Sequence, residues 1–242
     1  MRPTPPSRLL AKLPAIDPRR LLVRIATACV FGIGGVALFA VRWQLDGVLL
    51  YIVVANVAKL IGAEVTTRAV VLNARIGMGL YRGSPGLIAF GGVLPLLFPG
   101  SVPALLLLPV CIGFYAGCWW TLHNDLSEMM GRGTRSFQAT EVIATSVGTA
   151  ILIGISSLFT IEAAIAVGGV FALAGTFGKI PIDPKDLQKR IARWSVEARG
   201  RSDDVVANGK IIASSVAMIS FSALSCLRIE ALTGSTSILA GI

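Results

Sequence analysis

The residues best placed to carry chemistry are charged side chains inside long apolar runs. Lys59 lies almost midway along the run Gly47–Val71, and Asn56 stands three residues before it. Residues three or four apart share a helix face, so a helix here places Asn56, Lys59 and Ala63 on one side. A cation at the centre of a membrane helix costs about 2.5 to 3.5 kcal/mol. Lys59 therefore marks either a functional polar path or a lysine that is paired or snorkels.

The same run holds two further charges, Glu64 and Arg68. Glu64 is five residues from Lys59, about 140° around a helix at roughly 100° per residue, and does not obviously neutralise it. Glu64 and Arg68 are four residues apart. That spacing predicts a structural ion pair near the cytoplasmic boundary.

A carboxylate that could couple transport to protons is Glu141, about one turn inside the apolar run from 137 to 159. A carboxyl group in a partly desolvated place can gain and lose a proton near neutral pH. The alternative is a boundary ion pair with Arg75 or Arg135. Both interpretations stay open at the level of sequence.

Sequence motifs for enzymes, metals and cofactors are missing. The sequence has no Gly-x-x-x-x-Gly-Lys phosphate loop, no nucleophile elbow and no His-Glu-x-x-His. Its single histidine, His123, is interpreted as an interfacial polar residue, and Trp119 and Trp120 as an aromatic belt. The four cysteines form no CxxC pair. We expect no catalytic residue, no metal, no cofactor and no enzyme activity.

The elements that must position these residues are membrane helices. Of 242 residues, 54% are hydrophobic and 14% are charged, against roughly 25% charged in a soluble domain. The mean hydropathy is +0.76. The net charge of +9 is attributed to cations in short cytoplasmic loops, so no nucleic-acid partner is predicted.

The predicted fold class is all-α: a polytopic membrane protein with six to seven transmembrane helices in a transporter-like helical bundle. Each crossing needs about 20 apolar residues. The apolar runs lie at 21–41, 47–71, 85–100, 102–121, 137–159, 161–177 and 211–227.

The charge distribution divides the chain into four regions and orients it. Cations gather in alternate connections, which predicts a multi-pass protein of the bacterial inner membrane with a cytoplasmic N-terminus. Apolar residues at helical spacing from Leu187 to Ala198, among several bases, predict an interfacial helix that binds anionic lipid. The regions are a basic cytoplasmic tail (1–20), a six-helix membrane bundle (21–178), a basic cytoplasmic linker (179–210), and a seventh helix with the C-terminal tail (211–242).

The order of these parts resembles the amino-terminal half of a major facilitator superfamily transporter over roughly residues 20–228. Between the second and third spans, Arg75 and Gly77 are similar to the Arg-x-Gly portion of the family signature Gly-x-x-x-Asp-Arg-x-Gly-Arg-Arg. Ala74 stands where that signature has an acid. In the fourth span, the stretch from Gly113 to Gly117 lies near where the family often has small residues.

The resemblance implies transport of a small solute along a path between two six-helix halves. One half alone must then pair with a second copy or with a membrane-protein partner in the bilayer, so an oligomer is expected. Asn56, Lys59 and Glu141 are the candidate path residues. The alternative function is a non-transporting integral membrane subunit that assembles or anchors a larger complex. A lipid-acting enzyme is disfavoured.

Overall fold

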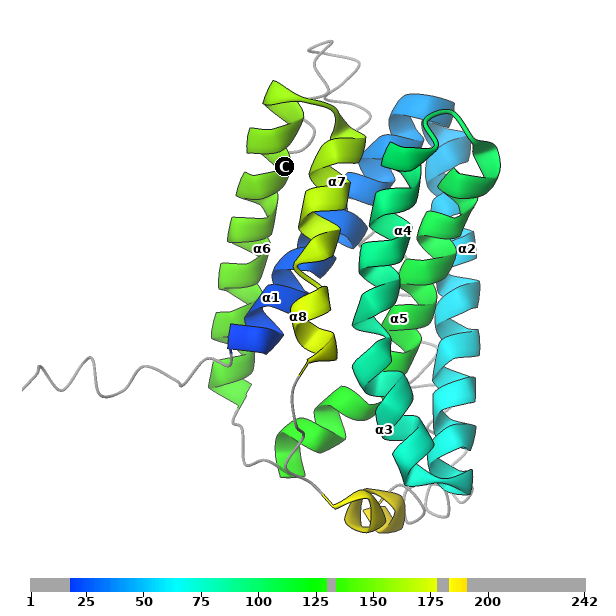
Figure 1. The fold of residues 1–242 in the computed structure, drawn as a ribbon, viewed down its shortest axis with the longest axis vertical. Coiled ribbons are helices and arrows are strands. Elements are labelled where there is room, and N and C mark those ends of the chain that lie inside the picture. Colours follow the sequence, from blue (N-terminus) through cyan, green and yellow to red (C-terminus); the bar gives the residue numbers. More distant parts are fainter. Residues whose placement is uncertain (1–17, 130–133, 178–182, 191–242) are drawn as a thin grey trace, which may run out of the picture.

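A computed structural model describes residues 18–129, 134–177 and 183–190 (Figure 1). Every regular element in those ranges is a helix, which confirms the all-α prediction. The tail up to residue 17, the remainder of the linker and the predicted seventh helix lie outside them. The elements are α1 (Pro18–Thr27), the π-helix η2 (Ala28–Gly35), α2 (Val36–Leu72), α3 (Ala74–Gly83), α4 (Pro85–Leu97), α5 (Val102–Met129), α6 (Thr134–Leu158), α7 (Ile161–Val170) and α8 (Leu173–Thr176).

These elements form six consecutive runs of helix that alternate in direction along the long axis (Figure 1). The first comprises α1, η2 and the start of α2, and it reverses at Trp43 and Gln44, where the α2 backbone is not helical. The other runs are the rest of α2, α3 with α4, α5, α6, and α7 with α8. The first six predicted apolar runs overlap these six runs of helix in order, and the seventh, 211–227, lies outside the described residues.

The segment that follows α2, expected as a connection between the second and third spans, is helical. Asn73 alone interrupts the helix, and its side chain accepts a hydrogen bond of 2.9 Å from the backbone N–H of Arg75. That bond caps α3, which places Arg75 and Gly77 on a helix. Ser84 keeps helical backbone angles before Pro85, so α3 continues into α4.

Three pairs of runs make the bundle: the first with the fifth, the second with the fourth, and the third with the sixth. If each run is replaced by the one three places later, counting from the sixth back to the first, the first–fifth pair becomes the second–fourth pair. The third–sixth pair stays the same. The third–fourth and sixth–first contacts are exchanged in the same way. Because direction alternates along the chain, the set formed by the first three runs and the set formed by the last three runs have opposite orientation.

Close backbone approach at glycine characterises each pair. A β-carbon on Gly113 or Gly117 of α5 would collide with the carbonyl oxygens of Ala55 or Lys59 in α2. Gly148 lies close to Ala28 and Ile25, and Gly169 lies close to Ile88, although a β-carbon would overlap less there. Small residues at helix contacts are the usual means of packing helices closely in membranes.

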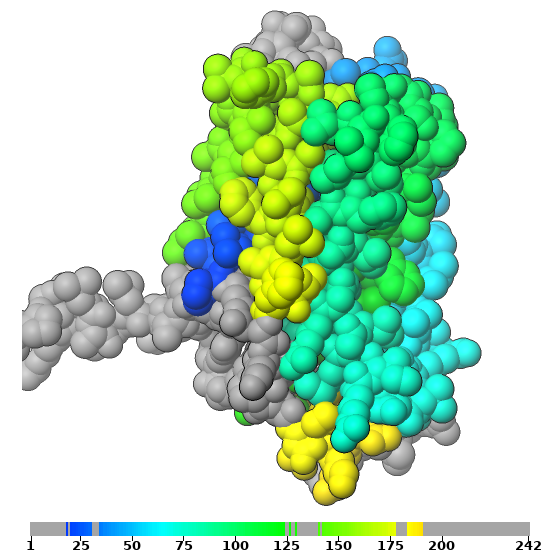
Figure 2. Space-filling model, in the orientation of Figure 1, coloured from blue at the N-terminus to red at the C-terminus, as the bar shows by residue number. Residues whose placement is uncertain are grey.

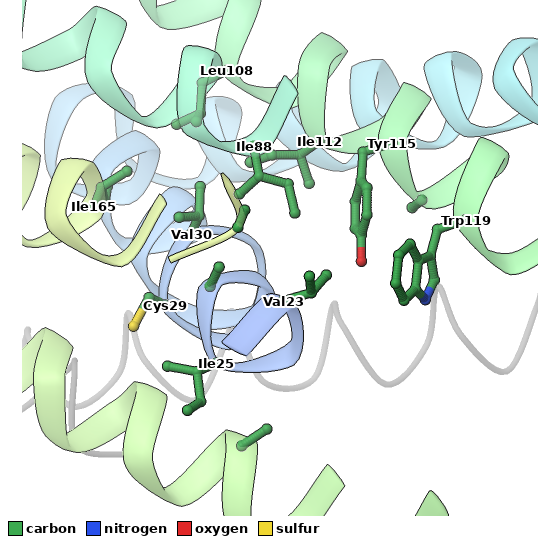
Figure 3. Packing of buried hydrophobic residues seen from close by; sticks show 14 of the residues in the cluster. Val23, Ile25, Cys29, Val30, Ile88, Leu108, Ile112, Tyr115, Trp119 and Ile165 are labelled. Carbon is green, nitrogen blue, oxygen red and sulfur yellow. The ribbon is translucent and has the colours of Figure 1, made fainter. Parts of the chain in front are cut away.

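The core lies around α1 and η2, which the other runs surround. Figure 3 shows Tyr115 and Trp119 pointing from α5 toward Val23, and Ile165 and Ile88 meeting Val30. The outward side chains of α2 are also apolar, among them Leu49, Val53, Val57, Leu60 and Ile61. Two helical stretches, Val36–Leu72 and Val102–His123, are individually long and apolar enough to cross a membrane.

Candidate functional site

One flank of α2 carries three polar side chains, which we name the α2 polar strip (Asn56, Lys59 and Thr67). They lie within about 80° of one another at roughly 100° per residue. All three are partly buried, between the face on α5 and the exposed apolar face. The structure thus brings Asn56 and Lys59 together on one flank, as their spacing predicts.

The members of the strip differ in how their hydrogen-bonding groups are satisfied. The Asn56 amide donates to the carbonyl oxygen of Ile52 at 2.8 Å, and the Thr67 hydroxyl donates to that of Ala63 at 2.9 Å. Lys59 forms no hydrogen bond or ion pair with any residue that the structure describes. Its ammonium group is therefore the one member of the strip available to a ligand or partner.

Glu141 does not join this strip. It belongs to α6, and α6 and α2 lie at opposite edges of the bundle (Figure 1). Its side chain lies outside the described part of the structure. The three candidate path residues are therefore not assembled into one site within a single bundle.

Glu64 and Arg68 form an ion pair between Arg68 Nε and Glu64 Oε1. Their side chains are 60% and 75% exposed, on the outward side of α2. A pair so exposed contributes at most about 1 kcal/mol to stability. Glu64 lies about 140° around the helix from Lys59 at roughly 100° per residue, and these two residues form no ion pair with each other.

Arg75 and Gly77 lie on different sides of α3. Arg75 is exposed at the end of the bundle, whereas Gly77 is buried against Val70 of α2. A β-carbon at Gly77 would collide with the Val70 side chain. Gly77 therefore lets α3 fold back closely on α2, while Arg75 stays available to solvent or ligand.

A second polar group, which the sequence analysis missed, is the aromatic–histidine cluster (Tyr81, Trp119, Trp120 and His123). His123 is 3% exposed and Trp119 is 4% exposed, so neither is the interfacial residue that we expected. The Tyr81 hydroxyl and His123 Nδ1 share a hydrogen bond of 2.9 Å. Trp119 stacks on Tyr81 at 4.5 Å and on His123 at 4.9 Å between ring centroids.

Residues of α1 extend the cluster toward the centre of the bundle. The guanidinium carbon of Arg24 lies 4.9 Å from the centroid of the Trp120 ring, a cation–π arrangement. Thr27 donates to the carbonyl oxygen of Val23 at 2.8 Å and contacts the Tyr115 hydroxyl at 3.3 Å. The cluster therefore ties α1, α3 and α5 together at one end of the molecule.

The linker begins against this same end of the bundle. Residues 184–190 are helical and lie below α3 (Figure 2). Leu187 is fully buried, and Gln188 Nε2 donates to the carbonyl oxygen of Val71 at 3.0 Å. Leu187, predicted to face lipid, thus faces the protein; Ile191, Trp194 and Ala198 lie outside the described residues. Within the described ranges, no group of three His, Cys, Asp or Glu residues is arranged to hold a metal.

No protein-family model matches this chain, and no curated protein or solved structure is significantly similar to it.

Proposed function

We propose that the chain is an integral membrane protein that moves a small solute as one bundle of an oligomeric transport assembly. The observation that carries this proposal is Lys59. It lies at the middle of the second run of helix, about 20 Å from either end at roughly 1.5 Å per residue. It is partly exposed and has no described partner. A cation at that depth needs water or a second molecule beside it.

The pairing of the six runs supports a transporter of the major facilitator type. Two sets of three helices with opposite orientation are the internal repeat of such transporters, and substrate sites lie at the mid-depth of the membrane. Lys59 has that depth, and it lies on the outside of the bundle. The solute path therefore runs between this bundle and a second one, and not through its packed core.

The membrane setting is supported by the apolar outer surface. Large apolar side chains are exposed on α2, α4, α5, α6 and α7, including Phe90, Val110, Val147 and Val170. An apolar surface of this extent is unusual for a soluble monomer. The orientation that places the N-terminus in the cytoplasm of a bacterial cell rests on the cations of the sequence.

The alternative function is a non-transporting subunit that anchors a larger complex. The observation that favours it is the linker helix, residues 184–190, which packs against the end of the bundle. Lys185 and Lys189 are exposed on it, at the end of the bundle. In that case Lys59 pairs with a buried acid of the partner. The two functions therefore differ in whether Lys59 is surrounded by water.

The deciding experiment measures water access and stability at position 59. Lys59→Cys in proteoliposomes should react with a hydrophilic thiosulfonate reagent, whereas Val57→Cys, on the exposed apolar face, should not. Lys59→Ala should leave thermal stability largely unchanged in a carrier. In an anchoring subunit the same change strands a buried acid and lowers stability by about 3 to 5 kcal/mol. Equal reactivity at 57 and 59 would contradict the transport proposal.

A further inference from the structure

A pocket of about 290 Å³ opens where the linker helix meets the corner between α2 and α3. Residues 73–75 form one wall, and residues 183–185 with Gln188 form the other. The hydrogen bond from Gln188 to Val71 and the buried Leu187 hold the two walls together. The pocket is therefore built from two segments that are more than a hundred residues apart in the sequence.

The charges in this pocket favour an anion. Arg75 and Lys185 line it from opposite walls, and neither forms an ion pair with a residue in the described part of the chain. The one acid among the lining residues is Asp183. Its Oδ1 already accepts a hydrogen bond of 2.9 Å from the backbone N–H of Lys185. Two cations thus face the pocket against one carboxylate with a local partner.

Exposed apolar side chains adjoin these cations. Leu72 is 82% exposed and Ile76 is 56% exposed, and they flank the pocket-forming residues 73–75 in the chain. A free inorganic anion makes no use of such neighbours. A phospholipid does, because its phosphate and its acyl chains need a cationic site and an apolar surface next to each other.

The depth of the pocket agrees with a lipid headgroup. The second run of helix extends from Leu45 to Leu72, about 42 Å at roughly 1.5 Å per residue. A bilayer with its headgroup regions is about 40 to 45 Å thick. When this run crosses a bilayer, the end at Leu72 lies among headgroups, and so does the pocket.

We propose that this pocket binds the phosphate of an anionic phospholipid between Arg75 and Lys185, with the acyl chains along Leu72 and Ile76. The inference rests on the proposed membrane setting and is independent of transport. The bound lipid links the linker helix to the α2–α3 corner. It therefore holds the linker against the bundle from outside, as Leu187 does from inside.

The test titrates the full-length protein in an uncharged detergent with dioleoylphosphatidylglycerol and follows its thermal midpoint. The lipid should raise the midpoint in a saturable way, and zwitterionic phosphatidylcholine should not. Arg75→Gln and Lys185→Gln should each weaken half-saturation about fivefold, which corresponds to roughly 1 kcal/mol per basic residue. Lys189→Gln is the matched control, since Lys189 is exposed on the same helix but does not line the pocket.

Three results would overturn the proposal. An equal effect of Lys189→Gln would mean diffuse attraction by surface charge. Equal protection by inorganic phosphate would mean a site for a free anion. No effect of the lipid on the midpoint would remove the site. Alkaline extraction of membranes tests the membrane setting separately, so its failure is distinguishable from the failure of this pocket.

Discussion

At the scale of single residues, Gln44 has the most unusual backbone dihedral angles of the described chain. Its φ of 51° and ψ of −137° make it the one non-glycine residue with positive φ in the described chain. These angles are those of the first central residue in a type II′ turn, where glycine is strongly preferred. A non-glycine residue in such a region costs on the order of 1 to 3 kcal/mol. The first reversal of the chain therefore carries strain.

Gln44→Gly should relieve that strain and raise stability by about 1 kcal/mol, since the gain exceeds the added entropy of glycine in the unfolded chain. Thermal unfolding of the purified protein in detergent measures the change. Gln44→Ala is the control, because alanine keeps the β-carbon that disfavours positive φ. Stabilisation by alanine of the same size would mean that the turn is unstrained.

The hydrogen bond between Tyr81 and His123 should stabilise the fold because both side chains are buried. Tyr81→Phe removes the hydroxyl and leaves His123 Nδ1 without it, which should lower the free energy of unfolding by about 1 to 3 kcal/mol. A double-mutant cycle with His123→Phe isolates the pair. If the two changes are additive, the hydrogen bond contributes nothing of its own.

At the scale of elements, the contact between α2 and α5 depends on backbones that approach at Gly113 and Gly117. Gly117→Leu should force the helices apart and lower stability by about 3 kcal/mol, because the obstacle is backbone and cannot rotate away. Gly154→Leu in α6 is the control, since a β-carbon there meets no atom within 4 Å. Equal losses for both would mean that the loss at Gly117 does not come from the contact between α2 and α5.

Helices could be predicted from the sequence because apolar runs of about 20 residues determine them directly. The predicted boundaries between 41 and 47 and between 100 and 102 lie at the break at Gln44 and at the turn that contains Gly100. α3 was missed because its sequence is short and carries Arg75 and Arg82. What makes it helical is the Asn73 cap together with its packing on α2, and the packing depends on the folded bundle.

The aromatic–histidine cluster was missed for a related reason. Trp119, Trp120 and His123 near a helix end match both an aromatic belt and a buried group. Only the positions of Tyr81 on α3 and Arg24 on α1 decide between them, and no local pattern connects those residues to α5. The i, i+4 spacing of Trp119 and His123 was the one available signal.

At the scale of the whole molecule, charge separates the two ends of the bundle. Arg75, Arg82, Lys185 and Lys189 lie at the end that holds α3 and the linker helix. Arg42 lies at the opposite end, where it pairs with Glu162 at 3.1 Å. Between the ends, the exposed side chains of α2 are mostly apolar apart from Glu64 and Arg68, and Lys59 is partly buried beside them. The proposed orientation, in which the first run starts in the cytoplasm, places the cation-rich end inside.

The charge asymmetry leads to a prediction for intact bacterial cells. Cysteines introduced at Asp46 and Ser101, at the end opposite the linker, should react with a membrane-impermeant maleimide. A cysteine at Lys189 should react only after permeabilisation, because the proposed orientation places that end in the cytoplasm.

The native cysteines should contribute little to this labelling signal. Cys29, Cys111 and Cys118 are buried, so a chain with Cys226→Ser should give little signal of its own. Labelling at 189 but not at 46 or 101 would invert the orientation. Labelling at all three sites in intact cells would mean that the bundle does not separate two compartments. In that case Lys59 would not lie at mid-membrane depth, and its need for a second bundle would disappear with the bilayer.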